Sequence, residues 1–285
     1  MIIDMHVHPV CKEATGENTD KEIIDAFAGS NKKSRRLWTN FMKVVKTKIS
    51  IETFIKLMDD FGIDKAVIVA FNIKTAYGVN LVTNDDIAKF ESLYSDRFIG
   101  FGCVDIPAPD AMDQLEYAIE SLNLKGIKLV PPVQKFDISD KKYDPLWKKM
   151  VDLNIPVWTH GGHQVSTAGS IAKYGHPMLI DEMAMRHEDL KIIIGHMGTP
   201  WFWDTYSTVL RHLNVYVDIS AHYELYNYFP WDAYTKYQIE DKVLFGSDHP
   251  LVHWNKILPT VKALPISDAF KNKILFENAQ KLLNL

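Results

Sequence analysis

Eight short apolar runs, each rich in β-branched residues, recur along this chain and constrain its fold more than any other feature. Each run has the length of a buried strand, and longer segments with the pattern of amphipathic helices separate most of them. The predicted strands cover residues 1–8, 65–71, 98–105, 126–130, 155–160, 191–197, 215–220 and 243–248. The clearest helical patterns cover residues 51–62, 110–123, 143–154 and 267–285.

This alternation of strands and helices predicts a parallel sheet with right-handed crossovers. Eight such units in a chain of 285 residues predict an α/β fold, the closed (β/α)8 or TIM barrel. An open doubly wound sheet is the alternative, but it usually carries a G-x-G-x-x-G motif after its first strand, and this chain has none. Neither an internal repeat nor a low-complexity linker divides the chain, so we expect one domain over residues 1–285.

The composition argues against several classes of protein. A net charge of −4 is unlike the basic footprint of a nucleic-acid binder, and no apolar run is long enough for a membrane helix. The first ten residues lack the features of a signal peptide, so we expect a cytoplasmic protein. Cys11 and Cys103 lie far apart in the sequence, which indicates two free thiols in a reducing compartment, with one disulfide as the alternative.

Histidine and aspartate residues stand at the C-terminal ends of four predicted strands. His6 and His8 end the first strand, His160 the fifth, His196 the sixth and Asp248 the eighth. A single His-x-His pair is uninformative, because chance alone produces one easily in a chain with 11 histidines. In a barrel, however, all these strand ends meet at one mouth, where the active site lies. Imidazoles with one carboxylate suit Zn²⁺, with Mn²⁺ and Fe²⁺ as alternatives, so we expect a divalent metal site.

Seven short motifs span the chain: DMHVHP (4–9), GIKLVPP (126–132), PVWTHGG (156–162), KIIIGHMG (191–198), VYVDIS (215–220), LFGSDHP (244–250) and FENAQKLLNL (276–285). As a set they resemble the amidohydrolase superfamily, and within it the amidohydrolase-2 branch that contains the aminocarboxymuconate-semialdehyde decarboxylase-like enzymes. The resemblance implies four metal ligands: His6, His8, His160 and Asp248. It also implies that His196 stands beside the metal-bound water as an acid/base or electrostatic partner. One metal ion is typical of the branch; a second ion bridged by a carboxylated Lys128 is the alternative.

Such a site supports hydrolysis or decarboxylation. A bound metal lowers the pKa of its water towards ~7, and Asp248 can accept the water proton, which would hydrolyse an amide, lactone or related bond. The same groups support non-oxidative decarboxylation, with His196 or Asp248 controlling protonation of the carbon that loses CO₂. Some decarboxylases of the branch carry Glu-x-His instead of His-x-His, so the sequence favours a metal-dependent hydrolase acting on a small, carboxylate-bearing molecule. A decarboxylase is the first alternative, and a non-catalytic metal-binding barrel is the second.

Residues 9–50 form a long connection after the first strand, and we expect them to cover the mouth as a lid. The second half of this segment is rich in lysine and arginine. Its basic side chains form either a solvated helical face or, through Arg35 or Arg36, a binding site for a substrate carboxylate.

Further residues close to the strand ends are candidates for the pocket wall. We expect substrate contacts from Lys128, Trp158, His163 and His222, and His249 is a further candidate for the pocket. The expected partner is a small-molecule substrate, and a homodimer is compatible with this kind of barrel. In the last motif, Phe276, Ala279, Leu282 and Leu283 have helical spacing and predict a helix packed on the core.

Overall fold

Eight parallel strands form the barrel in the computed structural model, which describes residues 1–9, 11–13 and 18–285. Neighbouring strands are hydrogen-bonded in the order β1-β2-β5-β6-β7-β8-β9-β10. Their bounds are β1 Ile3–Val7, β2 Lys65–Val69, β5 Phe98–Cys103, β6 Gly126–Leu129, β7 Val157–Thr159, β8 Ile192–Ile194, β9 Val215–Asp218 and β10 Val243–Leu244. All eight predicted strands are therefore present, and the predicted (β/α)8 fold class is confirmed.

The barrel closes between β1 and the segment that follows β10. The backbone N–H of Met5 donates to the carbonyl of Phe245 (2.8 Å), and that of Asp248 donates to His6 (2.9 Å). Just beyond this bond, the N–H of His8 donates to the carbonyl of His249 (2.8 Å). These bonds place the first metal-ligand candidates beside the last one, although more than 200 residues separate them in sequence.

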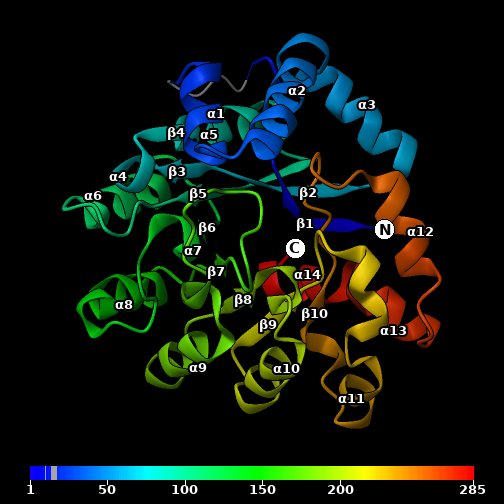
Figure 1. Cartoon of the computed structure of the whole chain (residues 1–285). Helices are drawn as coiled ribbons and strands as arrows, with labels where there is room; N and C mark the ends of the chain where they lie inside the picture. Colours follow the sequence, from blue (N-terminus) through cyan, green and yellow to red (C-terminus); the bar gives the residue numbers. More distant parts are fainter. Residues whose placement is uncertain (10, 14–17) are drawn as a thin grey trace.

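Helices surround the strands, as Figure 1 shows for α8 to α13. Their bounds are α1 Asp20–Ala28, α2 Lys32–Lys48, α3 Ile51–Phe61, α4 Lys74–Tyr77, α5 Asn84–Leu93, α6 Ala111–Glu116, α7 Pro131–Gln134, α8 Asp144–Asp152, α9 Pro177–Arg186, α10 Phe202–Arg211, α11 Trp231–Lys236, α12 Trp254–Lys262, α13 Asp268–Asn272 and α14 Asn278–Leu283. Two π-helical turns, Tyr117–Ser121 and Lys273–Glu277, follow α6 and precede α14. The four predicted helical segments are thus all helical, with these turns inside two of them.

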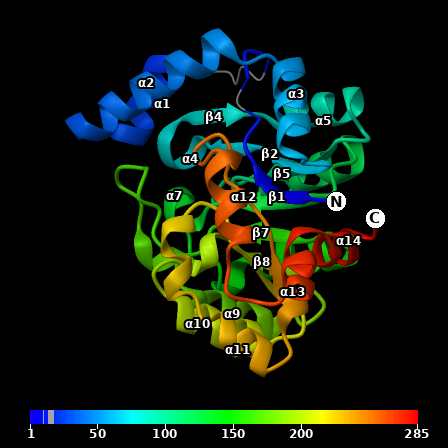
Figure 2. The same ribbon diagram turned by 90° about the vertical axis from the view of Figure 1, so that its right-hand side faces the viewer.

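The interior of the barrel is packed with side chains, and α14 closes its base. Ile3, Met5, Phe101 and Trp158 belong to one buried cluster inside the strands. The predicted packing of the last helix is confirmed, because four of its apolar side chains join this cluster: Phe276, Ala279, Leu282 and Leu283. A second cluster fills the layer between strands and helices. Figure 2 shows both termini on one side of the barrel, with α1 and α2 extending on the other side.

A hairpin absent from the sequence prediction follows β2. The predicted strand 65–71 ends at Val69, and β3 (Phe71–Ile73) then pairs antiparallel with β4 (Val79–Val82). The two strands of the hairpin are only three and four residues long, too short to show a clear alternation of apolar and polar residues in the sequence. The hairpin matters for the site, because Phe71 and Leu81 line the pocket described below.

A β-bulge in β1 turns His6 into the barrel. From Asp4 to Val7, β1 advances by three residues, whereas the paired part of β2, from Ala66 to Ile68, advances by only two. A bulge inserts an extra residue and re-aims the side chains that follow it. Ile3 and Met5 pack inside the barrel by ordinary alternation. After the bulge, the ring of His6 lies 4.2 Å from that of Trp158, and Val7 faces the helices.

Asp4 holds the closure of the barrel together from a fully buried position. Its Oδ1 accepts hydrogen bonds from the backbone N–H groups of His6 (3.1 Å) and Ser247 (2.9 Å). Its Oδ2 accepts from Nε1 of Trp254 in α12 (2.6 Å). Burial raises the pKa of Asp4 to about 7, and the hydrogen bonds oppose that rise. The carboxylate therefore ties β1 to the last loop of the barrel and to α12.

Asp4→Asn is expected to lower the free energy of unfolding by about 1–3 kcal/mol, because the new NH₂ group must face one of the three buried donors. Urea unfolding followed by circular dichroism measures the change. Asp60→Asn, at an exposed position of α3, is the matched control and should leave the urea midpoint in place. Equal stability of the two variants would contradict this role of Asp4.

Candidate metal centre and active site

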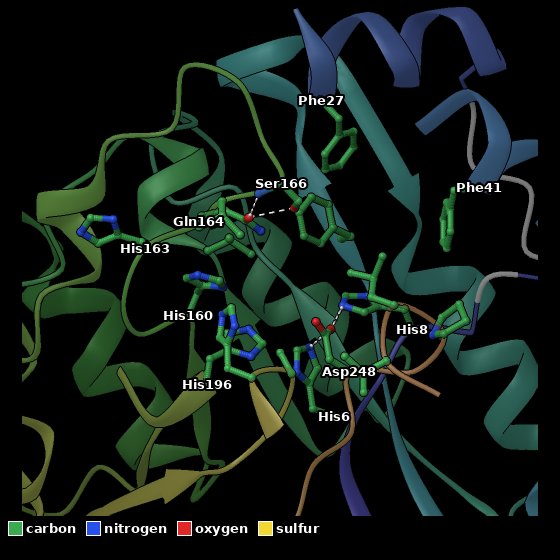
Figure 3. A pocket seen from close by; sticks show the side chains of 18 of the residues that line it. His6, His8, Phe27, Phe41, His160, His163, Gln164, Ser166, His196 and Asp248 are labelled. Atoms are coloured by element: carbon green, nitrogen blue, oxygen red, sulfur yellow. Dashed lines mark hydrogen bonds and ion pairs between the residues drawn. The ribbon is translucent and has the colours of Figure 1, made fainter. Parts of the chain in front are cut away.

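His6, His8 and Asp248 form a buried cluster at the C-terminal mouth of the barrel. One ligand atom of each residue lies within 4.8 Å of those of the other two. Nε2 of His8 lies 3.2 Å from Oδ1 of Asp248, and Nε2 of His6 lies 3.7 Å from the same oxygen (Figure 3). Two imidazoles facing one carboxylate at this spacing fit the ligand set of a divalent transition metal.

Asp248 reaches the cluster from a left-handed backbone conformation. Its φ is 68°, a region that aspartate tolerates better than most residues because its short side chain can hydrogen-bond locally. The hydrogen bond from its N–H to His6 holds this turn against β1. Such outliers collect at functional sites, where surrounding structure enforces them.

His160 follows β7 directly and points into the same cavity (Figure 3). Its backbone N–H donates to the carbonyl of Leu129 at the end of β6 (2.9 Å). Its Nε2 is buried and has no hydrogen-bond partner among the described residues. A buried ring nitrogen without a partner is costly unless it has another ligand, so His160 fits the role of a further metal ligand.

Ser220 connects the rings of His196 and His6. Its Oγ lies 2.8 Å from Nδ1 of His196 and 3.2 Å from Nδ1 of His6. These contacts engage the Nδ1 atoms, so each ring has its Nε2 on the side away from Ser220, and Nε2 of His6 also contacts Nζ of Lys128. Asp218 supports the arrangement, because its Oδ1 accepts from the backbone N–H groups of Ser220 (2.7 Å) and His196 (3.3 Å).

A second triplet has metal-like spacing: His6, His196 and Asp218. The Nδ1 atoms of its two rings already contact Ser220. The cluster that contains Asp248 is therefore the better candidate for a metal, and Asp218 and Ser220 orient the rings around it. The sequence did not indicate either orienting residue, although the end of the VYVDIS motif carries them.

Burial keeps the four histidines at the mouth neutral. It lowers the pKa of His160 to about 3, and it also lowers the pKa values of His6, His8 and His196. The ammonium group of Lys128 lowers each of these values further. Neutral imidazoles have the free lone pairs that metal coordination requires.

Lys128 lies on β6 at the floor of the cavity, and its side chain is 1% exposed. Its Nζ contacts Nε2 of His6 and lies 3.7 Å from the ring centroid of Trp158. Burial lowers the pKa of Lys128 to about 7, and the carboxylate of Asp248 opposes this shift. The structure places Trp158 beneath His6, inside the barrel, and not among the residues that line the cavity.

The cavity has a volume of about 290 Å³ and combines a polar floor with a largely apolar wall. Helices α1 and α2 contribute Phe27, Trp38 and Phe41 to the lining. That residues 9–50 act as a lid stays a prediction, and residues 10 and 14–17 of that segment lie outside the described residues. The remaining lining residues above the floor are Phe71, Leu81, Val130, His163, Gln164, Val165, Ser166, Ala221, His222, Glu224, Pro250, Leu251 and Val252.

The two arginines expected in the cavity lie elsewhere. Nη1 of Arg35 is 2.7 Å from Oδ1 of Asp25, and its Nη2 donates to the carbonyl of Gly29 (2.9 Å). Arg36 is exposed on the outer face of α2, whose buried face carries Trp38. The basic residues of α2 therefore fit the alternative prediction of a solvated helical face. The guanidinium of Arg35, which was expected to bind substrate, instead forms an ion pair with Asp25 on α1.

Three further histidines are divided between pocket and core. His163 and His222 line the cavity, and Nδ1 of His222 lies 3.7 Å from Oε1 of Glu224. His249 is 2% exposed and stacks on Trp254, with ring centroids 4.1 Å apart and planes at 6°. His249 therefore packs against α12 and does not line the cavity.

A closed α/β barrel with a buried histidine and aspartate cluster at its C-terminal mouth defines a class of metal-dependent enzymes. The family model described as amidohydrolase matches residues 3–285, and the chain therefore belongs to the amidohydrolase-2 family. This match confirms the resemblance inferred from the seven motifs. The protein is an enzyme of the amidohydrolase superfamily.

Individual relatives are distant but cover most of the chain. The gamma-resorcylate decarboxylase of Rhodococcus jostii is 23% identical, over 81% of this chain and 86% of its own length. An uncharacterised TIM-barrel protein from Bordetella bronchiseptica is 24% identical, covers 99% of this chain and 98% of its own, and superposes with a TM-score of 0.78. A dihydroxybenzoic acid decarboxylase from Polaromonas sp. JS666, with bound manganese and the inhibitor 2-nitroresorcinol, is 18% identical over 100% of this chain and 98% of its own, with a TM-score of 0.70.

No helix among the described residues is both long and apolar enough to cross a membrane.

Proposed function

We propose that this protein is a metal-dependent decarboxylase that removes CO₂, without oxidation, from a small aromatic or unsaturated carboxylic acid. The observation that carries the proposal is that curated relatives matching over four-fifths of the chain are gamma-resorcylate decarboxylases. This favours the alternative that the sequence ranked second, above the hydrolase that it ranked first. The aromatic side chains of the cavity wall are compatible with a planar substrate.

The residues proposed to hold one divalent metal ion are His6, His8, His160 and Asp248. Mn²⁺ is the first candidate, because the Polaromonas neighbour contains manganese, and the ligand set also suits the Zn²⁺ and Fe²⁺ expected from the sequence. When bound, the cation would supply positive charge that attracts the oxygen atoms of the substrate. We assign Lys128 to substrate binding, not to a carboxylated bridge between two metals.

Lys128 is the only lysine or arginine among the described residues that line the cavity. Its Nζ lies at the floor beside His6, where it can donate hydrogen bonds to a substrate carboxylate. The apolar wall of Phe27, Phe41 and Phe71 would contact the rest of the substrate and exclude water.

Decarboxylation breaks the bond between the carboxyl group and its carbon, which keeps the electron pair and takes up one proton. His196 and Asp248 both line the cavity and are the candidates to deliver that proton. His196 is neutral in its buried position, and Ser220 fixes its ring, so the ring can pass a proton on without reorienting. The homodimer and the cytoplasmic location remain predictions from the sequence.

A substrate panel tests this function. Metal-loaded protein is incubated separately with hydroxylated benzoates, unsaturated carboxylic acids, lactones and amides, and both CO₂ release and acid production are recorded. The proposal predicts CO₂ release from at least one carboxylic acid, and none from the same acid with the Asp248→Asn variant. Acid production from a lactone or amide without any CO₂ release would instead identify a hydrolase.

A further inference from the structure

Gln164 presents a fixed hydrogen-bond donor at the cavity. Its Oε1 accepts hydrogen bonds from the backbone N–H of Ser166 and from Oγ of the same residue, each at 2.8 Å. Two donors on one side of the amide determine which end is oxygen and which is nitrogen. The NH₂ group of Gln164 therefore lies on the side away from Ser166.

That NH₂ group has no hydrogen-bond partner within the part of the chain that the structure describes, although Gln164 lines the cavity and is half-buried. Figure 3 shows Gln164 beside Ser166 and near His160, farther from His6 and Asp248 at the floor. An amide donor without a partner in the wall is available to a ligand, and it loses hydration when an apolar molecule fills the cavity.

The segment that carries Gln164 is held in place from three directions. Its own backbone carbonyl accepts from Oγ of Ser170 (2.8 Å). The carbonyl of Ser166 accepts from Nε1 of Trp38 in α2 (3.0 Å), and the N–H of Ala168 donates to the carbonyl of Phe27 in α1 (2.7 Å). The donor is thus fixed relative to the aromatic wall before any ligand binds, which reduces the entropic cost of recognition.

The charges around the cavity restrict what this donor can recognise. Lys128, the one lysine among the lining residues that the structure describes, lies at the floor, and the carboxylate of Glu224 lies in the wall. Among the described lining residues, a second carboxylate on the substrate would find no lysine or arginine in the wall to pair with. A neutral oxygen, such as a phenolic hydroxyl or a carbonyl, accepts a hydrogen bond from an amide without needing a counter-charge.

We propose that Gln164 is a specificity-determining residue whose NH₂ group donates a hydrogen bond to a neutral oxygen substituent of the substrate. The substituent belongs to the part of the substrate that contacts the wall, while the carboxylate lies at the floor. This assignment rests on the proposed function for the orientation of the substrate. Ser166 is a positioning residue, because it acts only by holding the amide of Gln164.

The test measures dissociation constants, so it does not require turnover. Isothermal titration calorimetry on metal-loaded protein compares benzoate with 2-, 3- and 4-hydroxybenzoate. We expect at least one hydroxybenzoate to bind wild type more tightly than benzoate does. In Gln164→Leu, the ratio of the benzoate to the hydroxybenzoate dissociation constant should fall by about three- to tenfold, the usual contribution of one hydrogen bond. The affinity for benzoate and the metal content should stay within error of wild type.

Two variants act as controls. Ser166→Ala removes one of the two donors to Oε1 and should lose part of the same preference. Gln280→Leu replaces a half-buried glutamine of α14 at the base of the barrel and should change no dissociation constant.

Several results would overturn the proposal. One is a Gln164→Leu variant that weakens benzoate and the hydroxybenzoates by the same factor, which would mean a structural role. Another is a variant with unchanged preference, and a third is tighter binding of isophthalate or terephthalate than of benzoate by wild type. A protein that shows the predicted binding preference but releases no CO₂ from any acid would refute the proposed reaction and leave this assignment standing.

Discussion

Asp248→Asn is expected to remove most of the bound metal and nearly all activity. The carboxylate is the only anionic member of the cluster with His6 and His8, and asparagine keeps the shape of the side chain without its charge. We expect metal affinity to fall by at least about 100-fold and the rate of CO₂ release to fall by about 10²–10⁴-fold. Elemental analysis after gel filtration and a CO₂ assay measure the two effects.

The matched control for Asp248→Asn is Asp232→Asn, at an exposed position of α11. It makes the same chemical change away from the cavity and should retain both metal and activity. Full metal content in the Asp248 variant would remove Asp248 from the ligand set.

His196→Gln is expected to separate catalysis from metal binding. Nδ1 of His196 contacts Ser220, and the residue lies outside the cluster formed with Asp248. Glutamine can still reach Ser220 but cannot exchange a proton at neutral pH. We therefore expect kcat to fall by about 10²–10⁴-fold while the protein retains one equivalent of metal. Steady-state kinetics together with elemental analysis give both numbers.

His187→Gln is the control for the His196 variant, because His187 contacts Asp144 outside the cavity. It should preserve kcat. If His196→Gln lost its metal, His196 would be a ligand, and if it kept full activity, Asp248 alone would be left to deliver the proton.

The barrel and the cluster of His6, His8 and Asp248 could be predicted because both depend on strand periodicity and on where strands end. Each of the eight apolar runs is a strand, and His160 follows the end of β7 directly, as expected of a residue at the mouth. The convergence of His6, His8 and Asp248 follows from closure of the barrel between its first and last strands. These features need only local pattern and the topology of the fold.

Other features depend on contacts that no local pattern records. The bulge in β1 that turns His6 inward is an irregularity of pairing with β2, and the bridge from Ser220 to two rings depends on where neighbouring strand ends lie. Arg35 was expected to bind substrate because of its charge, and the sequence did not indicate that Asp25 would pair with it. Gln164 was not anticipated, because its role depends on the amide contacts with Ser166.

The central claim is that one metal ion at His6, His8, His160 and Asp248 supports decarboxylation. The most direct measurement starts from metal-free protein, adds Mn²⁺ in steps, and records bound metal and the rate of CO₂ release from the acid identified by the substrate panel. The account predicts that the rate rises with bound metal and reaches its maximum at one equivalent. Equal activity in metal-free protein, or a maximum reached only at two equivalents, would contradict it.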